Sequence, residues 1–277
     1  MPKKRRTTKT RRLNRKKYLI LVIILAVASG IYLNRAYAHI YGAIGGANLR
    51  PVNGEKTYIM TDVYLLEGFD LLNGVMAINE TDNTLIYTAL GDSLTAGAGT
   101  VRDKEILPYL LAGKIFAKDK QIILQNRAVP GAKTADVIAN FLPAAIGDNP
   151  DIITLLIGVN DIHDKVSAGE FQKNYEEILS RLKNETSAEI YVINLPFIGA
   201  DSLMLPPYQS LFDARTREFN KIIKKLADKY SVKYINLYSP TVDLFKHSGN
   251  HYSSDLFHPS AFGYQLWADI IYDSINK

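Results

Sequence analysis

The sequence contains no cysteine among its 277 residues. This absence excludes a disulfide-bonded scaffold, a thiolate metal site, an iron–sulfur cluster and a cysteine nucleophile. It does not decide the compartment, because an exported protein can also fold without disulfides. Disorder is excluded too, because 47% of the residues are hydrophobic and only 22% are charged, as in an ordinary globular protein. A chain of this length buries a sizeable core as one large domain or two small ones.

Acidic residues are missing from residues 1–17, which hold ten of the 33 Lys and Arg residues. The rest of the chain therefore has 23 basic and 28 acidic residues, a net charge of −5, although the whole chain carries +5. A basic tail thus precedes a mildly acidic body. The overall charge is for this reason not interpreted as nucleic-acid binding by the domain.

Charged residues are also missing from residues 18–33, YLILVIILAVASGIYL. As a helix this run spans about 24 Å, slightly less than the roughly 30 Å hydrocarbon core of a bilayer. The side chains of Lys17 and Arg35 can extend from its ends toward the interface. We predict a membrane anchor over residues 18–38, a cytoplasmic tail over residues 1–17, and a body outside the cytoplasm by the positive-inside rule.

Two alternatives to the anchor remain. The first is a secretory signal peptide that is cleaved after a small-residue site, Ala36-Tyr37-Ala38 or Ala26-Val27-Ala28, so that the body is secreted. The second is a buried core helix, which the ten preceding basic residues disfavour. Residues 39–84 form a stalk or an extension of unknown structure, in which residues 57–66 have the composition of a strand.

Residues 85–277 alternate between apolar runs and amphipathic helical patterns. The runs of strand length are residues 85–90, 121–125, 152–157, 190–195 and 232–237. Side chains with helical spacing predict three inward faces: Phe171, Tyr175, Ile178, Leu179 and Leu182; Leu211, Phe219, Ile222, Ile223 and Leu226; Phe262, Leu266, Trp267, Ile270 and Ile271. This pattern predicts an α/β fold, a three-layer α/β/α sandwich around a mainly parallel sheet of about five strands.

Ligands of such a sheet bind beyond the carboxyl ends of its strands. Ser93, in Gly91-Asp92-Ser93-Leu94, follows the first run on a strand-to-helix turn, where backbone N–H groups can face a developing oxyanion. The motif is not a Gly-x-Ser-x-Gly elbow, because Thr95 stands where the second glycine belongs. Gly131 follows the second run and Asn160 the third, and each can supply an N–H donor.

The segment Asp255-Leu256-Phe257-His258-Pro259 lies near the C-terminus. Pro259 biases His258 away from helical geometry, so His258 is predicted to project from a loop. Asp255 stands three residues earlier and can reach back to the imidazole. There it can hold one tautomer and stabilise the imidazolium, as the aspartate of a Ser-His-Asp triad does.

These four blocks, GDSL at 91–94, Gly131 in NRAVPG, GVND at 158–161 and DLFHP at 255–259, resemble the SGNH (GDSL-type) esterase and lipase family. The resemblance covers residues 85–277 and does not explain residues 1–84. It implies Ser93 as nucleophile, His258 as general base and acid, and Asp255 as the residue that orients His258. It further implies an oxyanion hole made of the Ser93 and Gly131 N–H groups and the Asn160 side chain. The family's five-stranded α/β/α fold agrees with the strand pattern.

The predicted function is therefore a serine ester hydrolase that needs no cofactor. An envelope lipid or an acylated glycan is the expected ester substrate, because the body is predicted to lie outside the cytoplasm. An acyltransferase that uses the same triad, and a non-catalytic binding module with the same fold, are the alternatives. The presence of all three triad residues disfavours the binding module. The sequence does not indicate an oligomeric state.

Three further groups of residues are assigned structural roles or left open. His247 and His251 have the spacing of helical zinc ligands, but Gly249 and Asn250 interrupt it, so no metal site is predicted and both histidines are placed in solvated loops. His163 and Asp164 are expected to cap a helix or face solvent. Residues 203–208 follow the fourth run and either line an acyl groove or pack on the next helix.

Overall fold

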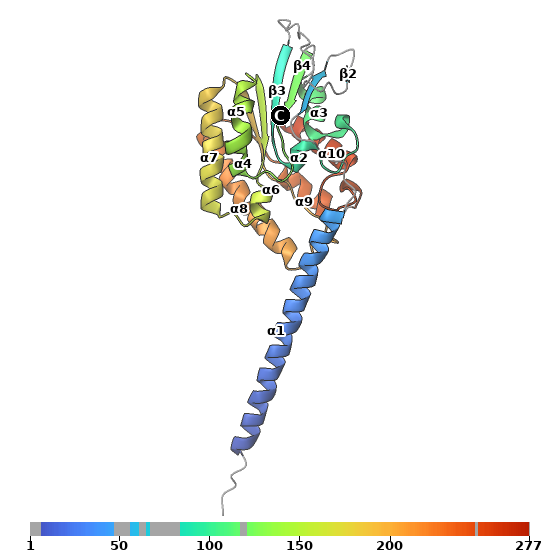
Figure 1. Ribbon diagram of the computed structural model, residues 1–277, viewed down its shortest axis with the longest axis vertical. Coiled ribbons are helices and arrows are strands. Elements are labelled where there is room, and N and C mark those ends of the chain that lie inside the picture. Colours follow the sequence, from blue (N-terminus) through green and yellow to red (C-terminus); the bar gives the residue numbers. More distant parts are fainter. Residues whose placement is uncertain are drawn as a thin grey trace, which may run out of the picture.

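A body of strands and helices stands at one end of a long helix, α1 (Thr7–Gly46), in the computed structural model (Figure 1). The structure describes residues 7–46, 56–60, 65–66, 84–116, 121–246 and 249–276. Helices cover both faces of one sheet. The predicted fold class, a three-layer α/β/α sandwich with a parallel sheet of five strands, is confirmed.

Five parallel strands form the centre of the sheet, in the order β4-β3-β5-β6-β7. Their bounds are β3 (Thr84–Gly91), β4 (Gln121–Asn126), β5 (Ile152–Leu156), β6 (Glu189–Ile193) and β7 (Lys233–Ile235). They correspond to the five predicted apolar runs, although β7 is shorter than the run 232–237. β5 is buried along its whole length, as expected of a strand with helices on both faces.

Two more strands extend the sheet beyond β4. β1 (Lys56–Met60) pairs antiparallel with β4, and β2 (Leu65–Leu66) pairs antiparallel with β1, which gives seven strands in the order β2-β1-β4-β3-β5-β6-β7. Part of residues 39–84 therefore belongs to the sheet. The strand-like composition of residues 57–66 indicated a strand but did not indicate its partner, which lies more than 60 residues further along the chain.

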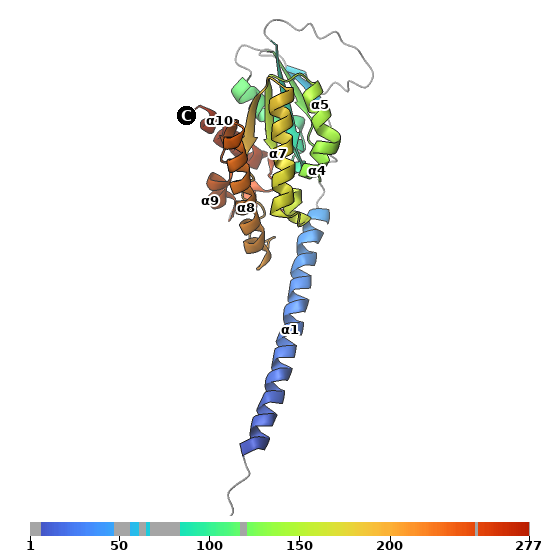
Figure 2. The same ribbon diagram turned by 90° about the vertical axis from the view of Figure 1, so that its left-hand side faces the viewer.

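The helices divide between the two faces of the sheet, with α3 and α10 on one face and α5, α7 and α8 on the other (Figures 1 and 2). The helices after α1 are α2 (Ser93–Ala96), α3 (Leu107–Leu111), α4 (Thr134–Asp136), α5 (Leu142–Gly147), α6 (Val159–His163), α7 (Ala168–Glu185), α8 (Tyr208–Lys229), α9 (Tyr238–Lys246) and α10 (Ala261–Ile275). Single turns of 3₁₀-helix cover Asp103–Glu105 and Gly249–His251, and π-helical turns cover Ala112–Phe116 and Val137–Phe141.

The predicted inward face of α7 is buried at all five positions. Two other predicted positions are wrong: Leu211 of α8 is 60% exposed and Phe262 of α10 is 59% exposed. Both residues stand in the first turn of their helix. Periodicity shows which side of a helix is apolar, but it does not show where along the helix the core ends.

Helix α1 has two parts with different surroundings. Residues 17–44 are long and apolar enough to cross a membrane, with a mean hydropathy of 2.0 and only 6% of the most apolar window buried. The large apolar side chains of residues 18–33 are exposed, whereas Ala36 and Ile40 are buried against the body. Within residues 17–44, whose side chains the structure describes, α1 therefore contacts the body through its C-terminal part (Figure 1).

Candidate active site

The carboxyl ends of the parallel strands lie at the end of the body from which α1 leaves. α2 follows β3, α4 lies beyond β4 and α6 lies beyond β5, and all three helices are at that end (Figure 1). The topology thus gathers the predicted site residues, which are far apart in the sequence, at one edge of the sheet.

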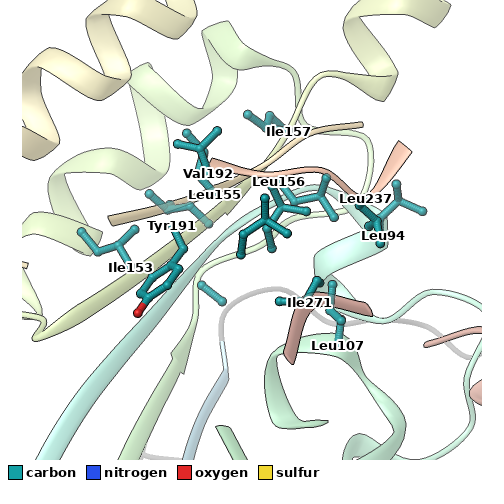
Figure 3. Close-up of a cluster of buried hydrophobic side chains, with 14 of the residues drawn as sticks. Leu94, Leu107, Ile153, Leu155, Leu156, Ile157, Tyr191, Val192, Leu237 and Ile271 are labelled. Carbon is teal, nitrogen blue, oxygen red and sulfur yellow. The ribbon is translucent and has the colours of Figure 1, made fainter. Parts of the chain in front are cut away.

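Ser93 is the first residue of α2, on a tight turn directly after β3. The Asp92 carboxylate caps this helix and accepts the Leu94 N–H at 3.0 Å. Gly91 is required by close packing, because a Cβ there would lie 2.1 Å from the Thr95 hydroxyl oxygen. Leu94 is fully buried in the same hydrophobic cluster as Leu156 and Leu237 (Figure 3). That burial contributes about 1.5–3 kcal/mol and fixes the turn on which Ser93 stands.

Ser93, His258 and Asp255 form a continuous chain of hydrogen bonds. The Ser93 hydroxyl lies 2.9 Å from Nε2 of His258, although the two residues are 165 positions apart. Nδ1 of His258 lies 2.5 Å from Oδ2 of Asp255. His258 is 7% exposed and Asp255 is completely buried. The structure thus brings together all three residues that the sequence predicted for the triad.

The second oxygen of Asp255 accepts three more hydrogen bonds within the acid–base loop (residues 252–259). The Ser253 hydroxyl donates to Oδ1 at 2.7 Å, and the Phe257 and His258 N–H groups donate at 2.9 Å. Burial alone would raise the pKa of Asp255, but the hydrogen bond and charge of His258, together with the Phe257 and Ser253 donors, hold it below its usual value. Asp255 is therefore an anion at neutral pH. Ser253 was not singled out in the sequence analysis.

The other side of the site is the loop of residues 131–134, here called the oxyanion loop after the role that the sequence predicted for Gly131. Gly131 has φ +83°, a conformation that favours glycine, and open space surrounds the position of a Cβ there. The Asn160 side-chain amide donates to the Ala132 carbonyl at 3.0 Å. An amide nitrogen carries two hydrogens, so the second remains for another acceptor. Neither the Ser93 nor the Gly131 N–H donates to an acceptor within the part of the chain that the structure describes.

Asp161 ties the oxyanion loop to α6. Its buried carboxylate accepts the Thr134 N–H at 3.0 Å and the Thr134 hydroxyl at 2.5 Å. Burial raises the pKa of Asp161, and the two Thr134 donors oppose that rise. Asp161 belongs to the GVND motif, but the sequence predicted no role for it. Its bonding partner Thr134 lies 27 positions away, so only the motif could have drawn attention to Asp161.

Asp92 is a second fully buried carboxyl group, next in sequence to Ser93 of the Ser93–His258–Asp255 chain. Burial raises its pKa to about 7, while the Leu94 N–H and the charge of His258 act in the opposite direction. Asp92 receives far fewer compensating donors than Asp255 does.

The remaining histidines have different surroundings. His163 is exposed and bonds Asp164 through Nδ1 at 3.0 Å, as the expected surface position suggests. His251 is not in a solvated loop as predicted, because its ring packs between Phe245 and Phe262. His247 lies outside the described residues.

The fold and the site together define a class of protein: an α/β/α sandwich with a hydrogen-bonded Ser-His-Asp chain at the carboxyl edge of its parallel sheet. The family model of the GDSL-like lipase/acylhydrolase family matches residues 89–266. The chain therefore belongs to this family, whose members are hydrolases that act on esters.

Two curated proteins are similar in sequence. A GDSL-like esterase of Mycobacterium tuberculosis is 26% identical over 187 residues, which are 66% of this chain and 59% of that protein. The spore germination lipase LipC of Bacillus licheniformis is 27% identical over 212 residues, covering 67% of this chain and 94% of LipC. The match thus spans less than two thirds of the mycobacterial esterase.

Solved structures share the fold at low sequence identity. LAE5, an enzyme from the metagenome of Lake Arreo, has a TM-score of 0.58 at 18% identity, over 69% of this chain and 95% of that one. TesA has a TM-score of 0.57 at 16% identity, over 69% of this chain and 97% of TesA. The acetylxylan esterase Axe2 from Geobacillus stearothermophilus has a TM-score of 0.54 at 18% identity, over 70% and 94%.

Proposed function

We propose that this protein hydrolyses carboxylic esters through an acyl-enzyme on Ser93. The observation that carries the proposal is the unbroken chain from the Ser93 hydroxyl through His258 to the ionised Asp255. His258 removes the hydroxyl proton while the oxygen attacks the ester carbonyl, and Asp255 stabilises the resulting imidazolium. His258 then gives the proton to the departing alcohol. A water molecule repeats the sequence, releases the acid and regenerates Ser93.

The oxyanion of the tetrahedral intermediate is assigned to three donors: the N–H groups of Ser93 and Gly131 and the Asn160 amide. The free N–H groups and the open surroundings of Gly131 support this assignment. The bond from Asn160 to Ala132 also supports it, because this bond holds the amide beside the oxyanion loop before substrate arrives. Donors fixed in advance need no reorganisation during the reaction.

We further propose that α1 is a retained anchor that holds the body outside the cytoplasm. Cleavage after residue 38 would remove Ala36, which is only 3% exposed in its contact with the body, so the contact favours retention. α1 also leaves the body at the catalytic end (Figure 1). The helical rise over residues 33–44 is about 17 Å, so the site would stand close to the membrane surface. This position favours an envelope lipid or an acylated glycan as substrate.

Replacement of Ser93 tests the reaction. Ser93→Ala should lower the hydrolysis of p-nitrophenyl acetate by about 10⁴-fold or more and abolish labelling by a fluorophosphonate, because no nucleophile remains. Ser254→Ala is the matched control, since Ser254 is an exposed serine of the acid–base loop, and it should keep full activity. Residual activity of Ser93→Ala within tenfold of wild type would contradict the mechanism. Product analysis with and without an acceptor alcohol distinguishes hydrolysis from acyl transfer.

Carbonate extraction and N-terminal sequencing test the anchor. A retained α1 keeps the protein in the membrane pellet, with its body open to protease added from outside. A mature N-terminus at His39 would show instead that the segment is cleaved.

A further inference from the structure

The C-terminal part of α1 lies against the candidate active site through residues 32–44, here called the docked segment. Ala36 and Ile40, one helical turn apart, are 3% and 9% exposed. Ile40 forms a buried cluster with Leu203 and Met204. Leu203 is completely buried in this cluster, so it does not line an open groove. It packs with Tyr208 and Phe212 of the next helix, α8, and also with Ile40 of α1, which the sequence did not predict.

The apolar side of the docked segment reaches the acid–base loop. Leu256 and Phe257, which separate Asp255 from His258, pack against the same cluster as Ile40. The Ala200 N–H donates to the Leu256 carbonyl at 3.0 Å, which joins the loop beneath α1 to the acid–base loop. The Phe257 ring in turn meets the His258 imidazole edge-on, with centroids 5.1 Å apart.

The polar side of the docked segment reaches the oxyanion loop. The Tyr41 hydroxyl is hydrogen-bonded to Nε2 of His163, the last residue of α6. Nδ1 of His163 bonds Asp164 at 3.0 Å, and Asp164 bonds the Lys133 ammonium at 2.9 Å. Lys133 stands between Ala132, which receives the Asn160 amide, and Thr134, which Asp161 holds. A chain of side-chain contacts therefore runs from α1 to the residues around the proposed oxyanion hole.

We propose that the docked segment positions the two halves of the active site relative to each other, so that α1 is needed for full turnover as well as for location. The proposal rests on the proposed esterase function. The acid–base loop and the oxyanion loop come from distant parts of the chain. The docked segment reaches the first through the Ile40 cluster and the second through His163 and Asp164. Ile40 acts through the cluster that Phe257 joins, and Tyr41 acts through His163, so both are positioning residues. Ala36 is buried one helical turn before Ile40 and keeps the docked segment against the body.

Anchoring itself would continue without these contacts, because α1 and the body belong to one covalent chain. Two other hydrogen bonds also join them. The Tyr32 hydroxyl donates to the Pro206 carbonyl at 2.9 Å, and the Tyr208 hydroxyl donates to the Leu33 carbonyl at 3.1 Å. Loss of positioning therefore predicts a lower kcat with little change in location. It also predicts little change in KM for a small soluble ester, which does not require the membrane.

The experiment uses the full chain in detergent with p-nitrophenyl acetate. Ala36→Asp places a charge in the buried contact, whereas Ala38→Asp makes the same change at an exposed position of the same helix. We expect kcat to fall about tenfold for Ala36→Asp with KM within twofold of wild type, and to stay within twofold for Ala38→Asp. Ala36→Ser, which keeps the small side chain, should restore most of the activity.

A second pair of variants tests the polar side of the docked segment with changes too small to disturb the fold. Tyr41→Phe removes only the hydroxyl that bonds His163, and kcat should fall about threefold, as expected for one lost hydrogen bond. Tyr18→Phe removes a hydroxyl from the exposed part of α1 and should have no effect. The proposal is overturned if Ala36→Asp matches Ala38→Asp in kcat, or if Tyr41→Phe matches Tyr18→Phe. An inactive wild-type protein would instead refute the esterase function itself.

Discussion

The turn that carries Ser93 and the loop that carries His258 each contain one fully buried aspartate, yet the two carboxyl groups have opposite pKa shifts. In the acid–base loop, four hydrogen bonds reach Asp255 and hold its pKa below the usual value. In the turn at the end of β3, the capping bond from Leu94 does not compensate for burial, and the pKa of Asp92 rises to about 7. Exclusion from solvent therefore does not by itself set the charge of a carboxyl group. The hydrogen-bond donors and the charges around the group act against its burial.

The difference suits the two positions. In the proposed mechanism Asp255 has to be an anion to stabilise the imidazolium of His258, and it has the donors that keep it one. Asp92 caps α2 beside the nucleophile, where a second full negative charge would oppose the oxyanion. The protonated form of Asp92 still accepts the Leu94 N–H through its carbonyl oxygen. Replacement of Asp255 and of Asp92 tests this comparison, and replacement of Asn160 tests the oxyanion that the neutral form of Asp92 would spare.

The largest loss of kcat is expected when the negative charge of Asp255 is removed. In Asp255→Asn the amide oxygen should stay at the Oδ1 position, because three donors already point there. The amide NH₂ then faces Nδ1 of His258 and forces the ring proton onto Nε2. That tautomer cannot accept the Ser93 proton, so kcat should fall about 10⁴-fold while the fold persists.

The measurement is ester hydrolysis together with the rate of fluorophosphonate labelling. Asp243→Asn is the matched control, because Asp243 is an exposed carboxylate of α9. Activity of Asp255→Asn within tenfold of wild type would show that the charge of Asp255 does not matter to His258.

The acid–base loop was also the part of the site most open to prediction from sequence. Asp255 and His258 are three residues apart, and Pro259 fixes the local geometry, so their contact follows from adjacent residues. The bond between Asp161 and Thr134 spans 27 positions, and the bond between Tyr41 and His163 spans 122. No local pattern reports such pairs, because they depend on how the sheet and α1 are assembled.

The fold also has parts that local sequence predicts and parts that depend on distant pairing. Strands buried on both faces appear in the sequence as continuous apolar runs, which is why the inner strands of the parallel sheet were predicted. The edge strand β7 is buried only at Ile235 and is shorter than the run 232–237 that predicted it. β1 pairs with β4 across a long stretch of chain, so composition alone could indicate a strand but not its place at the edge of the sheet. The exposed first turns of α8 and α10 show the limit of periodicity at the ends of helices.

A smaller effect is expected from replacement of Asn160. Its side-chain amide is the proposed oxyanion donor that comes from neither the Ser93 turn nor the acid–base loop. Asn160→Ala removes one oxyanion donor and the bond to the Ala132 carbonyl. kcat should fall about 10²–10³-fold with KM little changed, because the donor acts on the transition state more than on bound substrate. Asn160→Asp should be at least as damaging, since a carboxylate repels the oxyanion. Asn184→Ala, on the exposed side of α7, is the control. A fully active Asn160→Asp enzyme would remove Asn160 from the mechanism.

The smallest effect concerns stability and the neutral form of Asp92. The pKa of Asp92 is about 7 in the folded protein, above its ordinary value of 3.8, so the folded state holds the proton more tightly than the unfolded state does. Its contribution to stability is therefore complete below pH 3.8 and is lost as the pH rises through about 7. Asp92→Asn keeps a neutral acceptor for the Leu94 N–H at every pH. Its Tm relative to wild type should rise between pH 5 and pH 8, on the order of 3 °C. Asp243→Asn should show no such trend. Equal Tm differences for Asp92→Asn at both pH values would mean that Asp92 is ionised throughout, and the contrast with Asp255 would fail.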